Sequence, residues 1–417
     1  MAYEQTEVTH LFSEETGRAG ASALERLAAL KAAEIGMQVR QLSDWQAFEA
    51  MVASGDAQLV APVNARVALD WADPTSGVTK TYSDRFRVLG YREQAVKGQG
   101  PRPLCYLQQA LTLPFGTQFD NFEAFYAAPA GGLAAGTYRV SSAVTWGRLV
   151  KGQTYEFTLT KDLPEGGQLA FSSQCYGNEP SQVCSYASRG AAEAQETVPV
   201  TVGGTGGTLL GEMGTGALGD SDVNNAYRVG LGSNRWATSG LRQWLNSEAA
   251  AGAWWEPQTK FDRPPDYAST RAGYLSGFAD RDFVAALKPV EVRTALPYCD
   301  GGTESGTECD VTYDRVWLPS AEELYWAATG YGVPYGLEGA AFESYRQLHA
   351  VSTPASVWTV HKEYVMYSMG AETSAKYVWE RSAYRGYGCY VAMCSSAGSV
   401  ASDGAHYGYQ CAPLVAI

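Results

Sequence analysis

Histidines and closely spaced carboxylates are the residues of this 417-residue chain whose types could support metal or acid–base chemistry. The four histidines lie far apart, and none belongs to an HExxH motif or to a paired Cys/His spacing: His10, His349, His361 and His406. A zinc or iron site is therefore not expected. GxSxG, the P-loop and the Rossmann fingerprint are also absent, so the sequence carries no signal for a serine nucleophile or a bound nucleotide.

Three pairs of neighbouring carboxylates would suit a glycosidase only if two of them converged in one cleft. The pairs are Asp262 and Asp266, Asp280 and Asp282, and Glu322 and Glu323. Because the chain has 44 acidic residues, such pairs arise by chance. We therefore predict no enzymatic activity, no catalytic residue, no cofactor and no metal, and we keep a carbohydrate-active or protein-modifying enzyme as an alternative.

The most informative segment for chemistry is residues 381–412, which contain five tyrosines and three cysteines but no glutamate and no lysine. A buried pair of strands would carry leucine and isoleucine, and a solvated tail would carry charge. This segment is instead dominated by Tyr, Ser and Gly, which is the composition of an antibody paratope. The composition predicts a contact surface for a ligand.

Residues 209–417 also resemble the C-type-lectin-fold domains related to formylglycine-generating enzyme. Within that group they resemble the variable proteins of diversity-generating retroelements, of the phage receptor-binding type. The resemblance is carried, in chain order, by Gly232–Trp236, Ser239–Asn246, Asp314–Glu323, Val378–Ser382 and Ala412–Ile417.

In that family, adenines of asparagine codons are mutated during reverse transcription, and the altered codons cannot encode Lys, Glu, Gln, Met or Trp. Only Met393 and Gln410 of residues 381–412 belong to that inaccessible set. The resemblance implies that diversified side chains lie on one exposed face above a constant backbone. The candidate ligand-binding positions are Tyr384, Arg385, Tyr387, Cys389, Tyr390, Cys394, Ser395, Ser399, Ser402, Asp403, His406, Tyr407, Tyr409 and Cys411.

The resemblance also implies a constant scaffold and sets limits on the activity. The scaffold candidates are Trp379, Arg381, Ser382, Gly398, Pro413 and Ile417. The Glu-Pro-Asn, Gln-Pro-Asp and Trp-Asn-Asp triplets of calcium-dependent lectins are absent, as is the catalytic cysteine pair of formylglycine-generating enzymes. Neither calcium-dependent sugar binding nor that enzymatic activity is expected.

Three segments are expected to position this surface. Residues 1–57 read as a helical assembly segment, with helices over 22–35 and 43–52. Residues 58–208 alternate β-formers with Gly/Pro/Asp turns, which predicts a β-sandwich-like domain with strands near 59–63, 86–91, 137–140 and 155–160. Residues 209–417 form the lectin domain, with short helices over 239–247 and 320–326. The predicted class is α+β, with a C-type lectin fold at the C-terminal end.

Charge and cysteine usage narrow the possible partners. The net charge of −13 repels nucleic acids and anionic membranes, and no segment reads as a signal peptide or a membrane span. We expect synthesis in the cytoplasm, free thiols rather than disulfides, and a final place at the host-contacting tip of a virion.

The function predicted from these features is non-enzymatic recognition of a host receptor by a hypervariable surface. The expected partners are a host cell-surface protein or glycan, other virion proteins and further copies of this chain, with a trimer favoured by family analogy. No nucleic acid and no membrane insertion are expected. A structural virion component is a further alternative.

Overall fold

The two longest strands of the chain, β3 (Thr81–Val96) and β4 (Gln99–Gln109), form an antiparallel hairpin. Gly98 has a φ of 74° and occupies the tight turn between them, a conformation that favours glycine. The structure is a computed structural model of the chain. The residues that this structure describes are 39–40, 44–75, 77, 80–121, 126–142, 150–171, 181–187, 194–213, 228, 231–259, 262, 264–303, 307–326, 336–349, 366–369 and 371–417.

The hairpin joins strands from both ends of the chain into an eight-stranded sheet, in the order β1-β2-β3-β4-β22-β15, with β13 pairing both β3 and β14. The last strand of the chain lies between β4 and β15, with Val415 opposite Leu107 and Val316. The remaining strands of this sheet are β1 (Val39–Arg40), β2 (Arg66–Ala72), β13 (Val290–Ala295), β14 (Cys309–Asp314), β15 (Val316–Trp317) and β22 (Leu414–Ala416).

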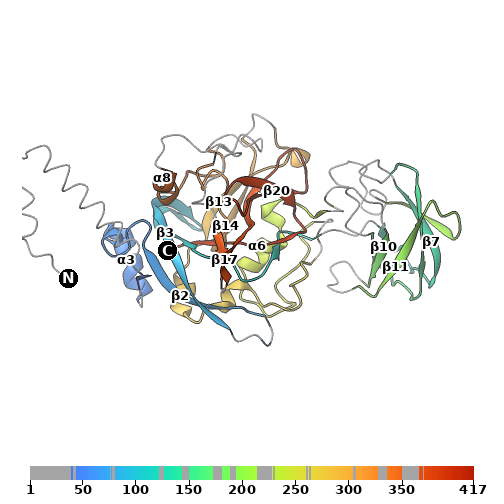
Figure 1. The fold of residues 1–417 in the computed structure, drawn as a ribbon, viewed down its shortest axis with the longest axis horizontal. Coiled ribbons are helices and arrows are strands. Elements are labelled where there is room, and N and C mark those ends of the chain that lie inside the picture. Colours follow the sequence, from blue (N-terminus) through green and yellow to red (C-terminus); the bar gives the residue numbers. More distant parts are fainter. Residues whose placement is uncertain are drawn as a thin grey trace, which may run out of the picture.

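A second sheet of seven strands is built from the segment between β4 and the later part of the chain. Its order is β12-β7-β8-β11-β10-β9-β6, and Figure 1 shows it in green at one end of the molecule. Phe157 and Phe171 pack edge to face in its own buried core. The strands are β6 (Tyr126–Ala127), β7 (Gly136–Ser142), β8 (Thr154–Leu159), β9 (Gln168–Phe171), β10 (Gln182–Tyr186), β11 (Glu196–Val202) and β12 (Thr208–Met213).

The sequence predicts one β-sandwich-like domain over residues 58–208, and this prediction is wrong. Strands β2 to β4 pair with strands that follow residue 209, and only β6 to β12 form a separate sheet. The physical reason is that a period-two pattern identifies a strand without identifying its partner. The seven-stranded sheet is thus an insertion within a larger body.

Three small sheets complete the body. β18 (Val378–Ala383), β19 (Tyr390–Cys394) and β20 (Val400–Gly404) form an antiparallel meander. β16 (Met366–Ser368) pairs with β17 (Ala371–Lys376), and β21 (Gly408–Tyr409) pairs with β5 (Thr117–Gln118).

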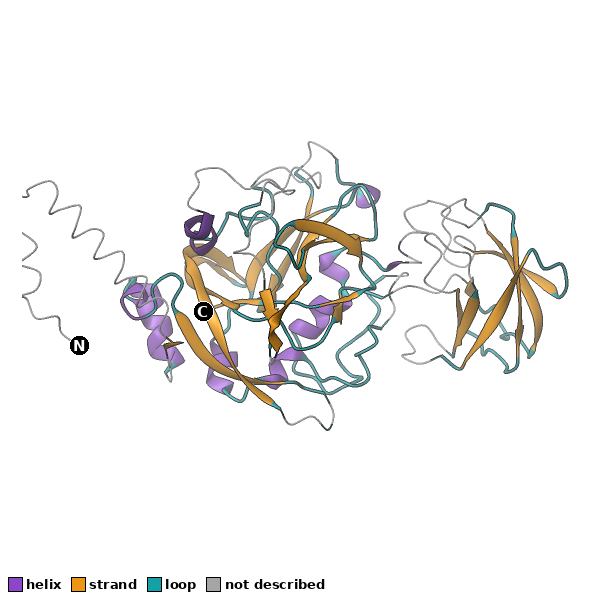
Figure 2. Ribbon diagram, in the orientation of Figure 1, coloured by secondary structure: helices purple, strands orange, loops and turns teal. Residues whose placement is uncertain are grey.

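The helices are short and surround the strands of the body, as Figure 2 shows. The α-helices are α3 (Trp45–Ser54), α4 (Ala57–Val60), α6 (Gly240–Leu245), α7 (Arg281–Ala286) and α8 (Glu343–His349), and the 3₁₀ helices are η4 (Trp236–Thr238), η5 (Tyr274–Gly277) and η6 (Tyr298–Asp300). None of the described helices is long and apolar enough to cross a membrane.

The predicted α+β class is wrong, because 41% of the structure is strand and only 15% is helix. Two expected helices are present: α3 has Asp44 as its N-cap, and α6 has Ser239. At the 320–326 position, Ser320 and Glu323 make the reciprocal capping-box hydrogen bonds, yet the segment is a turn in which Tyr325 has a φ of 67°. The helix expected over 22–35 lies outside the described residues.

The strand expected over 59–63 is also wrong, because residues 57–60 form α4. The strands expected near 86–91, 137–140 and 155–160 are confirmed as parts of β3, β7 and β8, where the alternation continues over more residues. Short apolar runs do not distinguish a strand from a helical turn, whereas longer alternation does.

Tryptophans fill the core of the body. Each buried indole N–H needs an acceptor. Trp236 donates to Asp314 Oδ2 at 3.0 Å, and Trp379 donates to the carbonyl oxygen of Thr117 at 2.8 Å. The fully buried indoles are Trp45, Trp71, Trp236, Trp244, Trp317, Trp326 and Trp379.

Candidate ligand-binding site

The meander of β18, β19 and β20 carries most of the predicted contact positions. Its central strand pairs with both neighbours, with Met393 opposite Trp379 on one side and Ala401 on the other. The connection from β18 to β19 spans residues 384–389, and the connection from β19 to β20 is a turn over residues 395–399. The tyrosines lie at the ends of these strands and in the first connection.

Three tyrosines form a first cluster on this meander. The ring centroids of Tyr384 and Tyr387 are 5.5 Å apart, and those of Tyr387 and Tyr390 are 5.4 Å apart. Tyr387 is 39% exposed, and the other two are half-buried. The rings therefore support one another while presenting part of their surface to solvent.

Asn234 fixes the backbone beneath this cluster. Its side chain is fully buried, and Nδ2 donates to the carbonyl oxygens of Tyr387 at 2.7 Å and Tyr390 at 2.9 Å. The carbonyl oxygen of Tyr384 lies farther away, at 3.4 Å, which is consistent with the two protons of one amide group serving two acceptors. One buried amide thus holds the middle of the tyrosine-bearing connection and the start of β19.

A second aromatic cluster lies beside β20 and combines Tyr377, His406, Tyr407 and Tyr409. Tyr409 is 5.4 Å from Tyr377 and 6.1 Å from Tyr407, measured between ring centroids, and the His406 ring is 4.2 Å from that of Tyr407. Tyr377 and Tyr407 are 41% and 45% exposed. The sequence analysis did not predict Tyr377 as a contact residue, because the segment rich in Tyr, Ser and Gly was taken to begin at residue 381.

Burial is the main influence on the protonation of this second cluster. Burial lowers the pKa of His406, whose Nδ1 lies 3.1 Å from the carbonyl oxygen of Leu231. The Tyr409 hydroxyl donates to Asp403 Oδ2 at 2.7 Å, and burial together with this carboxylate raises the pKa of Tyr409. His406 is therefore neutral at pH 7, and Tyr409 keeps its proton.

Five of the fourteen predicted contact positions are buried, so the structure corrects the prediction there. Their exposed fractions are at most 8%, and a ligand at the surface cannot reach them: Arg385, Cys389, Cys394, Ser395 and Cys411. Arg385 points inward, where Nε donates to the carbonyl oxygen of Leu296 at 2.7 Å. Residue composition cannot distinguish the inward from the outward side of a strand or turn, which explains these errors.

The other nine positions are exposed or half-buried: Tyr384, Tyr387, Tyr390, Ser399, Ser402, Asp403, His406, Tyr407 and Tyr409. We call this set, together with Tyr377, the tyrosine surface. No disulfide joins any of the seven cysteines in the described part of the chain. Burial raises the pKa of the Cys411 thiol to about 12, so this thiol stays protonated.

The predicted scaffold residues are buried in the structure, and Arg381 shows what they do. Its guanidinium is 1% exposed, forms an ion pair with Glu323 and donates to the carbonyl oxygen of Leu318 at 2.9 Å. The neighbouring Ser382 hydroxyl donates to Glu338. This network ties β18 to the segments around residues 318–323 and 338, so the strand beneath the tyrosine surface has a fixed position.

Most of the carboxylate pairs considered for catalysis have structural roles. Asp280 caps α7 and accepts the indole N–H of Trp45 at 2.7 Å, and Asp262 accepts from the backbone N–H of Gln258 and Thr259. Within the described residues, no group of three or more His, Cys, Asp or Glu side chains is placed to hold a metal ion. Asp266 differs, because it lies in a cleft.

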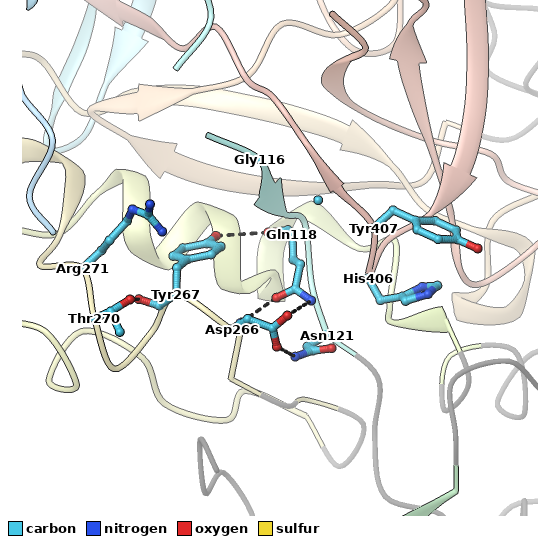
Figure 3. Close-up of a pocket in the computed structure, with 10 residues that line it drawn as sticks. Gly116, Gln118, Asn121, Asp266, Tyr267, Thr270, Arg271, His406 and Tyr407 are labelled. Carbon is cyan, nitrogen blue, oxygen red and sulfur yellow. Dashed lines mark hydrogen bonds between the residues drawn. The ribbon is translucent and has the colours of Figure 1, made fainter. Parts of the chain in front are cut away.

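This cleft adjoins the tyrosine surface and has a volume of about 490 Å³. Figure 3 shows the side chains of Gln118, Asn121 and Asp266 gathered in the middle, with Tyr267, Thr270 and Arg271 on one side and His406 and Tyr407 on the other. Three segments far apart in sequence line it, at 116–121, 266–271 and 406–408. No local pattern could have revealed it, because only the pairing of β5 with β21 brings the first and last of these segments together.

Comparison with known proteins gives one match. Residues 214–416 match the model of a family described as Domain of unknown function (DUF6273). The matched range contains β13 to β22 but not β2 to β5, which complete the eight-stranded sheet and the cleft. No curated protein and no solved structure matches the chain.

Proposed function

We propose that this protein is a non-enzymatic recognition protein that binds its partner through the tyrosine surface. The observation that carries the proposal is that all five tyrosines of residues 384–409 are exposed or half-buried, although β18 and most of β19 beside them are buried. Tyr384, Tyr390 and Tyr409 pack partly against the core, but none of the five is enclosed by it. Tyrosine combines a large apolar face with a hydroxyl group, and it is enriched among the residues that dominate binding energy.

The fixed frame beneath the rings supports the same proposal. Asn234 holds the connection that carries the first cluster, and the indole of Trp379 packs at 4.9 Å from the ring of Tyr409. A surface ordered before binding loses less conformational entropy when its partner arrives. Such a frame also tolerates replacement of the outward side chains, because their backbone is held by groups other than themselves.

The resemblance noted in the sequence points to the biological setting of this proposal. In that setting the chain is a variable protein of a diversity-generating retroelement, displayed at the host-contacting tip of a phage as a homotrimer. Its partner is a protein or glycan on the host cell. Weak binding at each copy would then be strengthened by simultaneous engagement of several copies.

A binding assay with whole cells tests the proposal. Fluorescently labelled full-length protein is applied to a panel of bacterial strains, and bound label is measured by flow cytometry. Replacing Tyr387 and Tyr407 by serine is expected to reduce binding at least about tenfold, because both rings lose their contact area. The matched control is Tyr313→Ser on β14, since this tyrosine is 38% exposed and lies outside the surface.

Unchanged binding by the control and lost binding by the double variant would support the proposal. Equal binding by the double variant and the original protein would overturn it, as would the absence of binding to every strain. Circular dichroism and thermal unfolding of each variant establish that the fold is retained.

A further inference from the structure

The cleft beside the tyrosine surface contains a rigid polar network. Gln118 Nε2 donates to Asp266 Oδ2 at 3.1 Å, the backbone N–H of Asp266 donates to Gln118 Oε1 at 2.6 Å, and Asn121 Nδ2 donates to Asp266 Oδ1 at 3.2 Å (Figure 3). Gln118 and Asn121 are 8% and 6% exposed, whereas Asp266 is exposed. Each carboxylate oxygen accepts one of these bonds and keeps a further lone pair for a ligand.

Arg271 supplies hydrogen-bond donors on one side of the cleft. Its guanidinium carbon lies 3.6 Å from the centroid of the Phe115 ring, and Nε is 3.4 Å from Asp73 Oδ1. These two contacts fix the plane of the group. Neither terminal nitrogen has a hydrogen-bond partner among the described residues, so both can donate to a bound molecule. The Thr270 hydroxyl lies next to this group in the chain and also lines the cleft.

Glycine allows two of the segments that line the cleft to approach closely. A Cβ atom at Gly116, just before β5, would lie 2.3 Å from the carbonyl oxygen of Gly408 on β21, so no side chain fits between the two backbones at this point. Gly408, also part of the lining, is exposed. The opposite wall is formed by His406 and Tyr407, whose rings lie against each other.

The lining has few chemical features that suit other ligand classes. It contains one carboxylate, one guanidinium, two amides and a threonine hydroxyl, together with the rings of Tyr267, His406 and Tyr407 and no large aliphatic side chain. A wholly apolar ligand would leave the polar groups unpaired, and a phosphate would meet the carboxylate of Asp266 as well as the guanidinium of Arg271. Hydroxyl groups both donate and accept, and they can pair with all of these groups at once.

We propose that this cleft binds a saccharide unit of the partner directly, without a metal ion. Ring hydroxyls of the sugar donate to Asp266 and accept from Arg271, and the volume of about 490 Å³ is sufficient for one or two sugar rings. The inference rests on the proposed function and refines it, since it makes a glycan part of the partner recognised by the tyrosine surface.

Saturation-transfer difference NMR on the full chain tests this proposal with defined probes. The probes are lactose, maltose, cellobiose, mannobiose, chitobiose and N-acetylneuraminic acid, each measured with and without EDTA. At least one is expected to bind, with equal affinity in EDTA. Asp266→Asn and Arg271→Lys are each expected to weaken that binding about tenfold or more, because one removes an acceptor and the other removes the fork of donors.

The matched control is Glu256→Gln, which alters an exposed carboxylate in another cleft of about 490 Å³ lined by Trp254 and Trp255. This variant is expected to bind the sugar normally. Failure of all six probes to bind, loss of binding in EDTA, or unchanged binding by both cleft variants would each overturn the saccharide proposal. If whole cells are still bound through Tyr387 and Tyr407 in that case, the proposed function survives and only the assignment of the cleft is wrong.

Discussion

Glu380 gives a prediction about stability that follows directly from its burial. The side chain lies on β18, is 1% exposed, and neither carboxylate oxygen has a hydrogen-bond partner in the described structure. Burial, and to a smaller extent the nearby Glu338 carboxylate, raises the pKa of Glu380 from 4.5 to about 8. Glu380 is therefore protonated in the folded chain at neutral pH and ionised in the unfolded chain.

This difference sets the sign and the size of the effect. Because the folded pKa is the higher one, the stabilising contribution is complete below about pH 4.5 and is lost as the pH rises to about 8. Each unit between the two pKa values corresponds to about 1.4 kcal/mol, so the total is roughly 5 kcal/mol. Glu380→Gln keeps the shape and cannot ionise. It is expected to match the original protein near pH 4.5 and to exceed its stability progressively toward pH 8.

Urea unfolding followed by tryptophan fluorescence at pH 5, 6, 7 and 8 measures this difference. The control is Glu93→Gln, since Glu93 is exposed on β3 and has no ion pair among the described residues. It should parallel the original protein at every pH. If Glu380→Gln also runs parallel to the original protein across this range, then Glu380 is ionised in the folded state and the reasoning is refuted.

Three further predictions concern the Asn234 amide beneath the first tyrosine cluster, Gly116 in the cleft and the buried thiol of Cys411. Asn234→Ala should lower the free energy of unfolding by about 2–3 kcal/mol and speed hydrogen exchange over residues 384–390, because two carbonyl oxygens lose their donor; unchanged exchange would contradict the role of Asn234. Gly116→Ala should cost about 1–3 kcal/mol through the clash with Gly408, whereas Gly100→Ala, which meets nothing within 4 Å, should be close to neutral in thermal unfolding. Iodoacetamide at pH 8 should leave Cys411 unmodified in the native protein, as mass spectrometry would show, because the thiol is fully buried with a pKa of about 12; rapid labelling would mean that this part of the core opens.

The sequence predicted local features where the cause is local. The short helix that follows Ser239 and the alternation of β8 depend on neighbouring residues, and both appear in the structure. The pairing of β22 with β4 joins residues about three hundred positions apart, so no window of sequence contains its cause. The overestimated helix content has the same origin, since propensity favours a helix wherever tertiary pairing is ignored.

The candidate site was predictable to a similar extent. The bias toward Tyr, Ser and Gly identified the segment, because an outward surface is free to depart from core composition. Composition could not show whether the side chains of Cys389 and Arg385 point into the core or toward solvent, since that depends on the register and on the fold of the connection. The cleft around Asp266 arises entirely from tertiary structure and left no mark in the sequence pattern.

The outward side chains of the tyrosine surface are proposed to vary while the buried residues beneath them stay constant. Sequencing this gene from many closely related isolates measures that variation. Amino-acid differences are expected to concentrate at the exposed and half-buried positions of residues 384–409 and to spare Asn234, Trp379 and Arg381. Differences spread evenly along the chain, or gathered at the buried positions Cys389 and Cys411, would contradict this expectation.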